Sequence, residues 1–243
     1  FQAEDGIRDC LLSRGLGDVY KRQSWNYPFY TEKVFNKEEC KEIGESILRR
    51  EKEIIQEFKD ITNDGGTGLG GDSLTAKFSK FSVWEWDEPW VNTLRDTINR
   101  GCAAMGQYMH DEGLWDIGCG QVDGFNHREE QYYSQCWANV MRSGEQILPH
   151  WHSSYKDSFL GAHLTIAAKR TGTYYSNPFN KQVVKGFANK PGELFIFPNH
   201  LVHWTDKHDH PFERITIAMD ILTKEGWDEH PDKSIKPNYK MIT

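Results

Sequence analysis

The second half of the chain alternates short β-prone segments with clusters of Gly, Pro and Asn. Strands of this length and spacing predict a β-sandwich, a barrel or a jelly roll. The expected strands are Tyr132–Arg142, Ser158–Ala168, Thr173–Ser176, Gln182–Lys185, Glu193–Phe197 and Glu213–Leu222.

The first half is expected to be mainly helical. Asn36 and Glu39 form a capping-box pattern, and apolar residues then follow at helical spacing to about Ile61. Pro89 begins a second amphipathic stretch that runs to about Asp111, while 74–86 is expected to be extended. We therefore predict a helical lead-in over 24–119, a β core over 120–223 and a tail over 224–243 that wraps the surface or frays.

A glycine-rich loop, 63–73, lies between the two predicted helices. Gly66, Gly68 and Gly71 formally satisfy G-x-G-x-x-G. The dinucleotide motif requires a strand before it and a helix after it, whereas here a helix precedes and an extended segment follows. Nucleotide binding is therefore not expected.

Residues 1–23 do not read as part of the domain. Their apolar residues keep no steady period, and they have no apolar core of a signal peptide. The stretches AEDGIRD and SRGLGDVYKRQ resemble translated sequencing-adapter read-through. A non-native leader is the expectation, and a real flexible arm is the alternative.

The composition argues against some classes of partner and favours a reducing compartment. The net charge of −7 gives no bulk attraction for nucleic acid, and no stretch approaches the about 18 apolar residues of a membrane span. Five cysteines, an odd number without a C-x-x-C pair, argue against a disulfide framework and favour a cytoplasmic, reducing setting.

Three histidines are candidates for a metal site. His150 and His152 are two apart, so in an extended segment both side chains point the same way. His203 follows a predicted strand and a Pro-Asn turn, from where a loop side chain could meet them. Imidazoles on a rigid β scaffold suit Fe(II), Mn, Zn or Cu.

Arg214 is a candidate anion-binding residue. In the last predicted strand, Ile215, Ile217, Met219 and Ile221 share one face, and Arg214, Thr216 and Ala218 share the other. If the apolar face packs on the helices, Arg214 points into the barrel. A buried guanidinium needs an anion, and a carboxylate held by Arg and a Thr hydroxyl fits that need.

Glycine and proline spacing around these histidines resembles the two cupin motifs. The matching residues are Gly144, His150, His152, Asp157 in the usual Glu place, Gly161, Gly192, Pro198 and His203. This resemblance implies a double-stranded β-helix, a jelly roll with a metal at its mouth.

With Arg214 and Thr216 eleven and thirteen residues after His203, the chain resembles Fe(II)/2-oxoglutarate-dependent oxygenases, in particular phage- and marine-type members. The further matching residues are Trp137, Asn139, Pro149 and Phe197. The resemblance implies that His150 and His203 bind iron and that Arg214 and Thr216 bind the distal carboxylate of 2-oxoglutarate, with Asn139 as a further candidate contact. It also allows a phage or viral origin.

One position departs from that family, because most members have H-x-D where this chain has His152. Three interpretations follow. His152 completes a three-histidine iron site, which we favour; or His152 lies behind the metal; or Asp157 supplies the carboxylate.

The resemblance implies oxidation of a C–H bond, usually hydroxylation, coupled to conversion of 2-oxoglutarate and O2 to succinate and CO2. The alternatives are a cupin-type dioxygenase or isomerase without 2-oxoglutarate, and a non-catalytic metal- or ligand-binding jelly roll. A small molecule or a peptide is the expected substrate, and the loops at 62–73, 110–131 and 204–212 are candidates to shape its site. The pattern leaves the substrate itself and the oligomeric state open.

Overall fold

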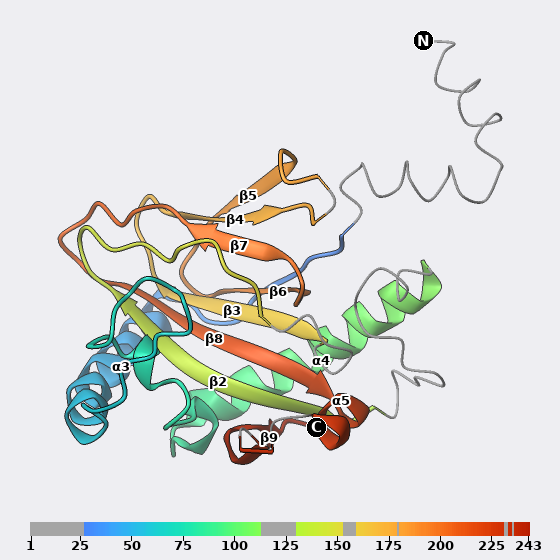
Figure 1. The fold of residues 1–243 in the computed structure, drawn as a ribbon, viewed down its shortest axis with the longest axis horizontal. Helices are drawn as coiled ribbons and strands as arrows, with labels where there is room; N and C mark the ends of the chain where they lie inside the picture. Colours follow the sequence, from blue (N-terminus) through green and yellow to red (C-terminus); the bar gives the residue numbers. More distant parts are fainter. Residues whose placement is uncertain (1–26, 113–129, 153–158, 179, 231–232, 235) are drawn as a thin grey trace, which may run out of the picture.

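The computed structural model describes residues 27–112, 130–152, 159–178, 180–230, 233–234 and 236–243. The described chain forms two antiparallel sheets, a six-stranded sheet in the order β1-β6-β3-β8-β2-β9 and a three-stranded sheet in the order β5-β4-β7. The small sheet lies over one face of the large sheet, and helices cover the other face (Figure 1). The strands are β1 (Tyr30–Lys33), β2 (Tyr132–Met141), β3 (Leu160–Ala167), β4 (Gly172–Ser176), β5 (Val184–Ala188), β6 (Glu193–Pro198), β7 (Val202–Thr205), β8 (Arg214–Thr223) and β9 (Lys240–Met241).

Two long helices form the outer layer, α3 (Lys37–Glu57) and α4 (Pro89–Asp111). The side chain of Asn36 accepts hydrogen bonds from the backbone of Glu38 and Glu39, and Glu39 completes the predicted capping box. Pro89 stands at the first position of α4, where its missing N–H costs nothing. Both predicted helices are therefore confirmed.

The apolar face of β8 packs against these helices. Ile215, Ile217, Met219 and Ile221 belong to one buried cluster with residues of α3 and α4 that include Ile43, Ile47, Leu94 and Ile98. Side chains alternate across a strand, so the even-numbered residues of β8 face the small sheet. The predicted orientation of this strand is confirmed, and Arg214 lies between the sheets.

Two local expectations were wrong. The 74–86 segment is not extended: it contains the 3₁₀ turns η1 (Thr75–Lys77) and η2 (Val83–Glu85). His203 lies in a strand, β7, rather than in a loop. For the tail, which was expected to wrap the surface or fray, the described residues form α5 (Lys224–Glu229), the 3₁₀ turn η3 (Lys236–Asn238) and β9, which pairs with β2 at Tyr133 and Ser134.

Several expectations fall outside the described residues: the leader 1–23, Asp157, and 113–129 of the 110–131 loop. The domain limits at 119 and 120 lie there too and stay a prediction. No described helix combines the length and apolar composition needed to cross a bilayer.

Candidate metal centre

His150, His152 and His203 meet between the two sheets. Each offers a ring nitrogen, and these three nitrogens lie within 4.8 Å of one another. His150 and His203 form an isolated antiparallel bridge, in which each backbone N–H donates to the other's carbonyl at 3.1 and 2.9 Å. This bridge fixes the H-x-H segment against β7. Backbone pairing therefore brings His150 and His203 together although they are far apart in the sequence.

The second nitrogen of each ring is already engaged. Nδ1 of His150 lies 2.8 Å from the Leu148 carbonyl, and Nδ1 of His203 lies 2.9 Å from the Leu201 carbonyl. A carbonyl only accepts, so each Nδ1 carries the proton and donates, which leaves Nε2 as a lone-pair ligand. Nε2 of His152 lies 3.3 Å from Nε2 of His203.

His152 is held by a carboxylate that the sequence pattern did not single out. Its Nδ1 lies 2.5 Å from Oδ1 of Asp220 on β8. Asp220 continues the inward series of Arg214, Thr216 and Ala218 by one more step, so strand alternation is the signal that could have found it.

The electrostatics suit metal ligation. Burial, followed by the charge of nearby His152, lowers the pKa of His150 to about 4. Burial and the other two rings hold the pKa of His203 well below its ordinary value. Burial also lowers the pKa of His152, but the charge and hydrogen bond of Asp220 outweigh it and raise the pKa overall. His150 and His203 are thus neutral near pH 7, as metal ligands must be.

The three histidines line a pocket between the two sheets. In the strand register, Thr216 lies opposite Asn139 of β2 and Thr165 of β3, and the small Ala218 lies opposite Trp137 and His163. The pocket walls from the two sheets are Trp137, Asn139, Ala162, His163, Thr173, Phe197, His203, Thr205, Arg214, Thr216 and Ala218.

Arg214 lies in the same pocket and is only 2% exposed. One guanidinium nitrogen is 3.1 Å from Sδ of Met141, and Nε has no hydrogen-bond partner in the part of the chain that the structure describes. No carboxylate of the described residues is within ion-pair distance of it. Burial lowers its pKa to about 10, so it remains a cation at neutral pH. A desolvated cation of this kind is a site for an anion.

Asn139 is oriented by two donors. Trp137 Nε1 donates to its Oδ1 at 3.0 Å and Thr75 Oγ1 donates at 2.7 Å. An indole N–H can only donate, so the oxygen position is fixed and the amide NH2 is left for another acceptor. Thr75, in η1, was not expected at the site from the sequence.

His163 also lies in the pocket wall, with Nε2 2.8 Å from the Tyr175 hydroxyl. The sequence favours an ordinary core histidine at this position. Burial, followed by the charge of Arg214, lowers its pKa to about 3, so the ring is neutral. Tyr175 is fully buried and packs against the rings of Phe197 and His203.

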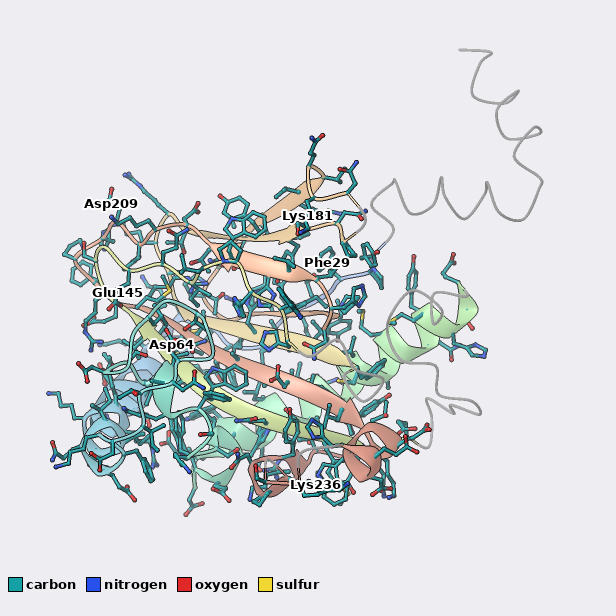
Figure 2. The ribbon with its side chains drawn as sticks, in the orientation of Figure 1. Phe29, Asp64, Glu145, Lys181, Asp209 and Lys236 are labelled. Carbon is teal, nitrogen blue, oxygen red and sulfur yellow. The ribbon has the colours of Figure 1, made fainter. Side chains whose placement is uncertain are left out.

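The glycine-rich loop forms part of the pocket's rim. Thr67 lines the pocket, and its carbonyl accepts the N–H of Leu148 at 2.8 Å. Asp64 holds the loop closed by accepting the N–H groups of Gly66 and Gly70 at 3.0 Å each. Figure 2 labels Asp64 in this loop, at the same end of the molecule as Glu145.

A scan against protein-family models found no match, and neither did a search of curated proteins. Among solved structures, a prolyl-4-hydroxylase from Pseudomonas putida superposes with a TM-score of 0.50 at 11% identity, covering 81% of this chain and 88% of that one. The two chains share a fold. It is the double-stranded β-helix expected from the sequence, with the two sheets as its walls.

A viral collagen prolyl hydroxylase from Paramecium Bursaria Chlorella virus-1 also matches, with a TM-score of 0.43 at 12% identity. That match covers 80% of this chain and 94% of that one.

Proposed function

We propose that the protein is an Fe(II)- and 2-oxoglutarate-dependent oxygenase, most simply a hydroxylase. The observation that carries the proposal is that one pocket holds three convergent imidazole nitrogens and a buried arginine with no acidic partner among the described residues. The imidazole nitrogens suit a metal ion, and the buried guanidinium suits a carboxylate.

The donor set fits iron. Imidazole suits Fe(II), and three ligands from one side leave coordination positions open for small molecules. The neutral rings of His150 and His203 and the engaged Nδ1 atoms present Nε2 without further rearrangement. When bound, iron would supply activation of O2 coupled to oxidative decarboxylation of 2-oxoglutarate.

The rest of the pocket fits a dicarboxylate. Arg214 can hold the distal carboxylate through its guanidinium, and the Thr216 hydroxyl, on the same face of β8, can donate to it. The free amide of Asn139 can orient the cosubstrate along the pocket. Ile147, Ala162 and Phe197 make the walls partly apolar, which limits water around the reacting groups.

The test is anaerobic reconstitution with Fe(II), followed by titration with 2-oxoglutarate while the visible charge-transfer absorption is recorded. The parent protein should develop the band, His203→Ala should abolish it, and Arg214→Ala should weaken it by raising the Kd for 2-oxoglutarate. His110→Ala, which removes an exposed histidine of α4, is the matched control and should leave the band unchanged.

Iron binding without a band and without any effect of 2-oxoglutarate would refute this proposal. No binding of Fe(II), Mn(II), Co(II) or Zn(II) would refute the metal site itself.

The third imidazole supports a second candidate, a cupin-type oxygenase with a three-histidine site and no 2-oxoglutarate. Arg214 would then bind a carboxylate of the substrate. Release of succinate in the presence of O2 separates the two, because only the first candidate produces it.

We also propose a small molecule or a peptide as substrate and a cytoplasmic location. The net charge of −7 disfavours bulk nucleic-acid binding. Cys40, Cys102 and Cys136 are buried free thiols, which agrees with a reducing compartment.

A further inference from the structure

The three-histidine set differs in charge from the more common iron site with two histidines and one carboxylate. A two-histidine-one-carboxylate site gives its metal one negative ligand, whereas three neutral imidazoles give none. Asp220 lies directly behind one of these imidazoles, with Oδ1 2.5 Å from Nδ1 of His152.

We propose that Asp220 is a positioning residue that supplies the negative charge of the metal site through His152. It would orient the ring so that Nε2 faces the metal and increase the ring's basicity as a ligand. This inference rests on the proposed metal site and names a residue that the sequence motif does not assign to it.

The placement of Asp220 is fixed by the large sheet. It lies on β8 between Gln135 of β2 and Gly161 of β3, and its side chain is 17% exposed. Gly161 has no room for a side chain, since a Cβ there would lie 2.8 Å from the Phe197 ring. The contact that the structure gives this carboxylate is with the ring of His152.

Among the described residues, no cation competes for Asp220. Within the described chain, His152 is the only basic side chain at ion-pair distance from it. Nor is Asp220 part of the cluster that could hold an ion directly, which among the described residues consists of the three histidines. A partly buried carboxylate with a single imidazole partner that itself faces a metal position is the arrangement of a carboxylate–histidine–metal relay.

Two substitutions separate charge from hydrogen bonding. Asp220→Asn keeps an oxygen that can accept from Nδ1 but removes the charge, and Asp220→Ala removes both. Co(II) is the probe, because its visible bands report binding and geometry without O2 or 2-oxoglutarate. We expect Asp220→Asn to weaken Co(II) binding about tenfold and Asp220→Ala more.

The Fe(III)/Fe(II) reduction potential provides a readout that a merely structural role would not move. Loss of the carboxylate should raise this potential, because less negative charge then favours Fe(II). Asp206→Asn is the matched control: Asp206 accepts from Gly172 N and Tyr174 Oη and contacts none of the three histidines. It should change neither the Co(II) affinity nor the potential.

An Asp220→Asn protein that melts like the parent, binds Co(II) within about twofold of it and keeps its potential would overturn the inference. Failure of the proposed function has a different signature, a parent that binds Co(II) but shows no response to 2-oxoglutarate. A parent that binds no metal overturns both.

Discussion

The guanidinium of Arg214 is 2% exposed, and its described contact is the sulfur of Met141. In the ligand-free protein this buried charge is a cost. Replacing it by Met, of similar length but uncharged, should raise the free energy of unfolding by about 1–3 kcal/mol. The same change should abolish the rise in Tm that 2-oxoglutarate gives the Mn(II)-loaded parent. Denaturant titration and thermal melts with and without 2-oxoglutarate measure the two effects.

Arg142→Met is the control for this prediction. Arg142 makes a two-pronged ion pair with Glu51, at 3.0 and 2.7 Å, and Glu51 is 3% exposed. Its loss should lower stability, because it leaves a buried carboxylate unpaired, and should not affect the response to 2-oxoglutarate. An Arg214→Met protein that is less stable than the parent would show that the arginine already has a stabilising partner.

For single residues, the sequence predicted the direction of those side chains that follow the alternation of a strand. The inward direction of Arg214 and Thr216 followed from the apolar alternation of β8. Asp220 obeys the same alternation, yet its importance depends on His152, which reaches it only through the fold. Thr75 was not predictable, because a 3₁₀ turn that brings its hydroxyl to Asn139 leaves no periodic signal.

Among the structural elements, the glycine-rich loop packs against the residue that orients one of the metal-site histidines. Gly68 has φ +82°, and a Cβ there would lie 2.6 Å from Leu148, whose carbonyl accepts from Nδ1 of His150. Gly68→Ala should therefore displace Leu148 and weaken Co(II) binding by up to about tenfold. It should also lower stability by about 2–3 kcal/mol, from backbone strain and overpacking together.

Gly66→Ala measures how much of the loss of stability comes from backbone strain alone. Gly66 has nearly the same φ, +80°, but a Cβ added there would meet no atom of the described residues within 4 Å. The substitution should cost about 1–2 kcal/mol and leave Co(II) affinity unchanged. Equal Co(II) affinities of the two variants would show that the loop does not support His150.

The long, periodic elements were predictable and the short ones were not. The two helices and the strands around 132–142 and 213–222 have clear repeats over ten residues or more. β1 and β7 have four residues each, too few for a period, and both are defined by partners far along the chain. The 74–86 segment was expected to be extended, but it contains two 3₁₀ turns, which are too short to give a periodic signal.

Over the whole molecule, the main apolar core and the pocket lie on opposite faces of the large sheet. The core joins α3 and α4 to the outer face, whereas the pocket lies between the sheets. Changes in pocket polarity, such as those at Arg214 or Asp220, therefore leave the helix–sheet packing intact. The stability of the whole then depends strongly on how the helical layer is held together.

Glu88, just before α4, ties this layer together. Its carboxylate accepts from Ser46 Oγ at 2.5 Å, from Arg50 at 3.0 Å, both on α3, and from Trp90 Nε1 at 2.5 Å. Burial alone would raise the pKa of Glu88, but these donors outweigh it and lower the pKa below its ordinary value. The stabilisation is therefore complete above the unfolded-state pKa of about 4.3 and is lost as the pH falls through the lower folded-state value.

Glu88→Gln should lower the free energy of unfolding by about 1–2 kcal/mol at pH 7, since the amide loses the charge-assisted hydrogen bonds. The difference from the parent should shrink below about pH 4, because the parent's own carboxyl is then protonated. Urea titrations between pH 7 and pH 3 measure it, with Asp87→Asn at the exposed neighbouring position as control. A difference that stays constant across this range would mean that the hydrogen-bond geometry, and not the charge of Glu88, holds α3 to the start of α4.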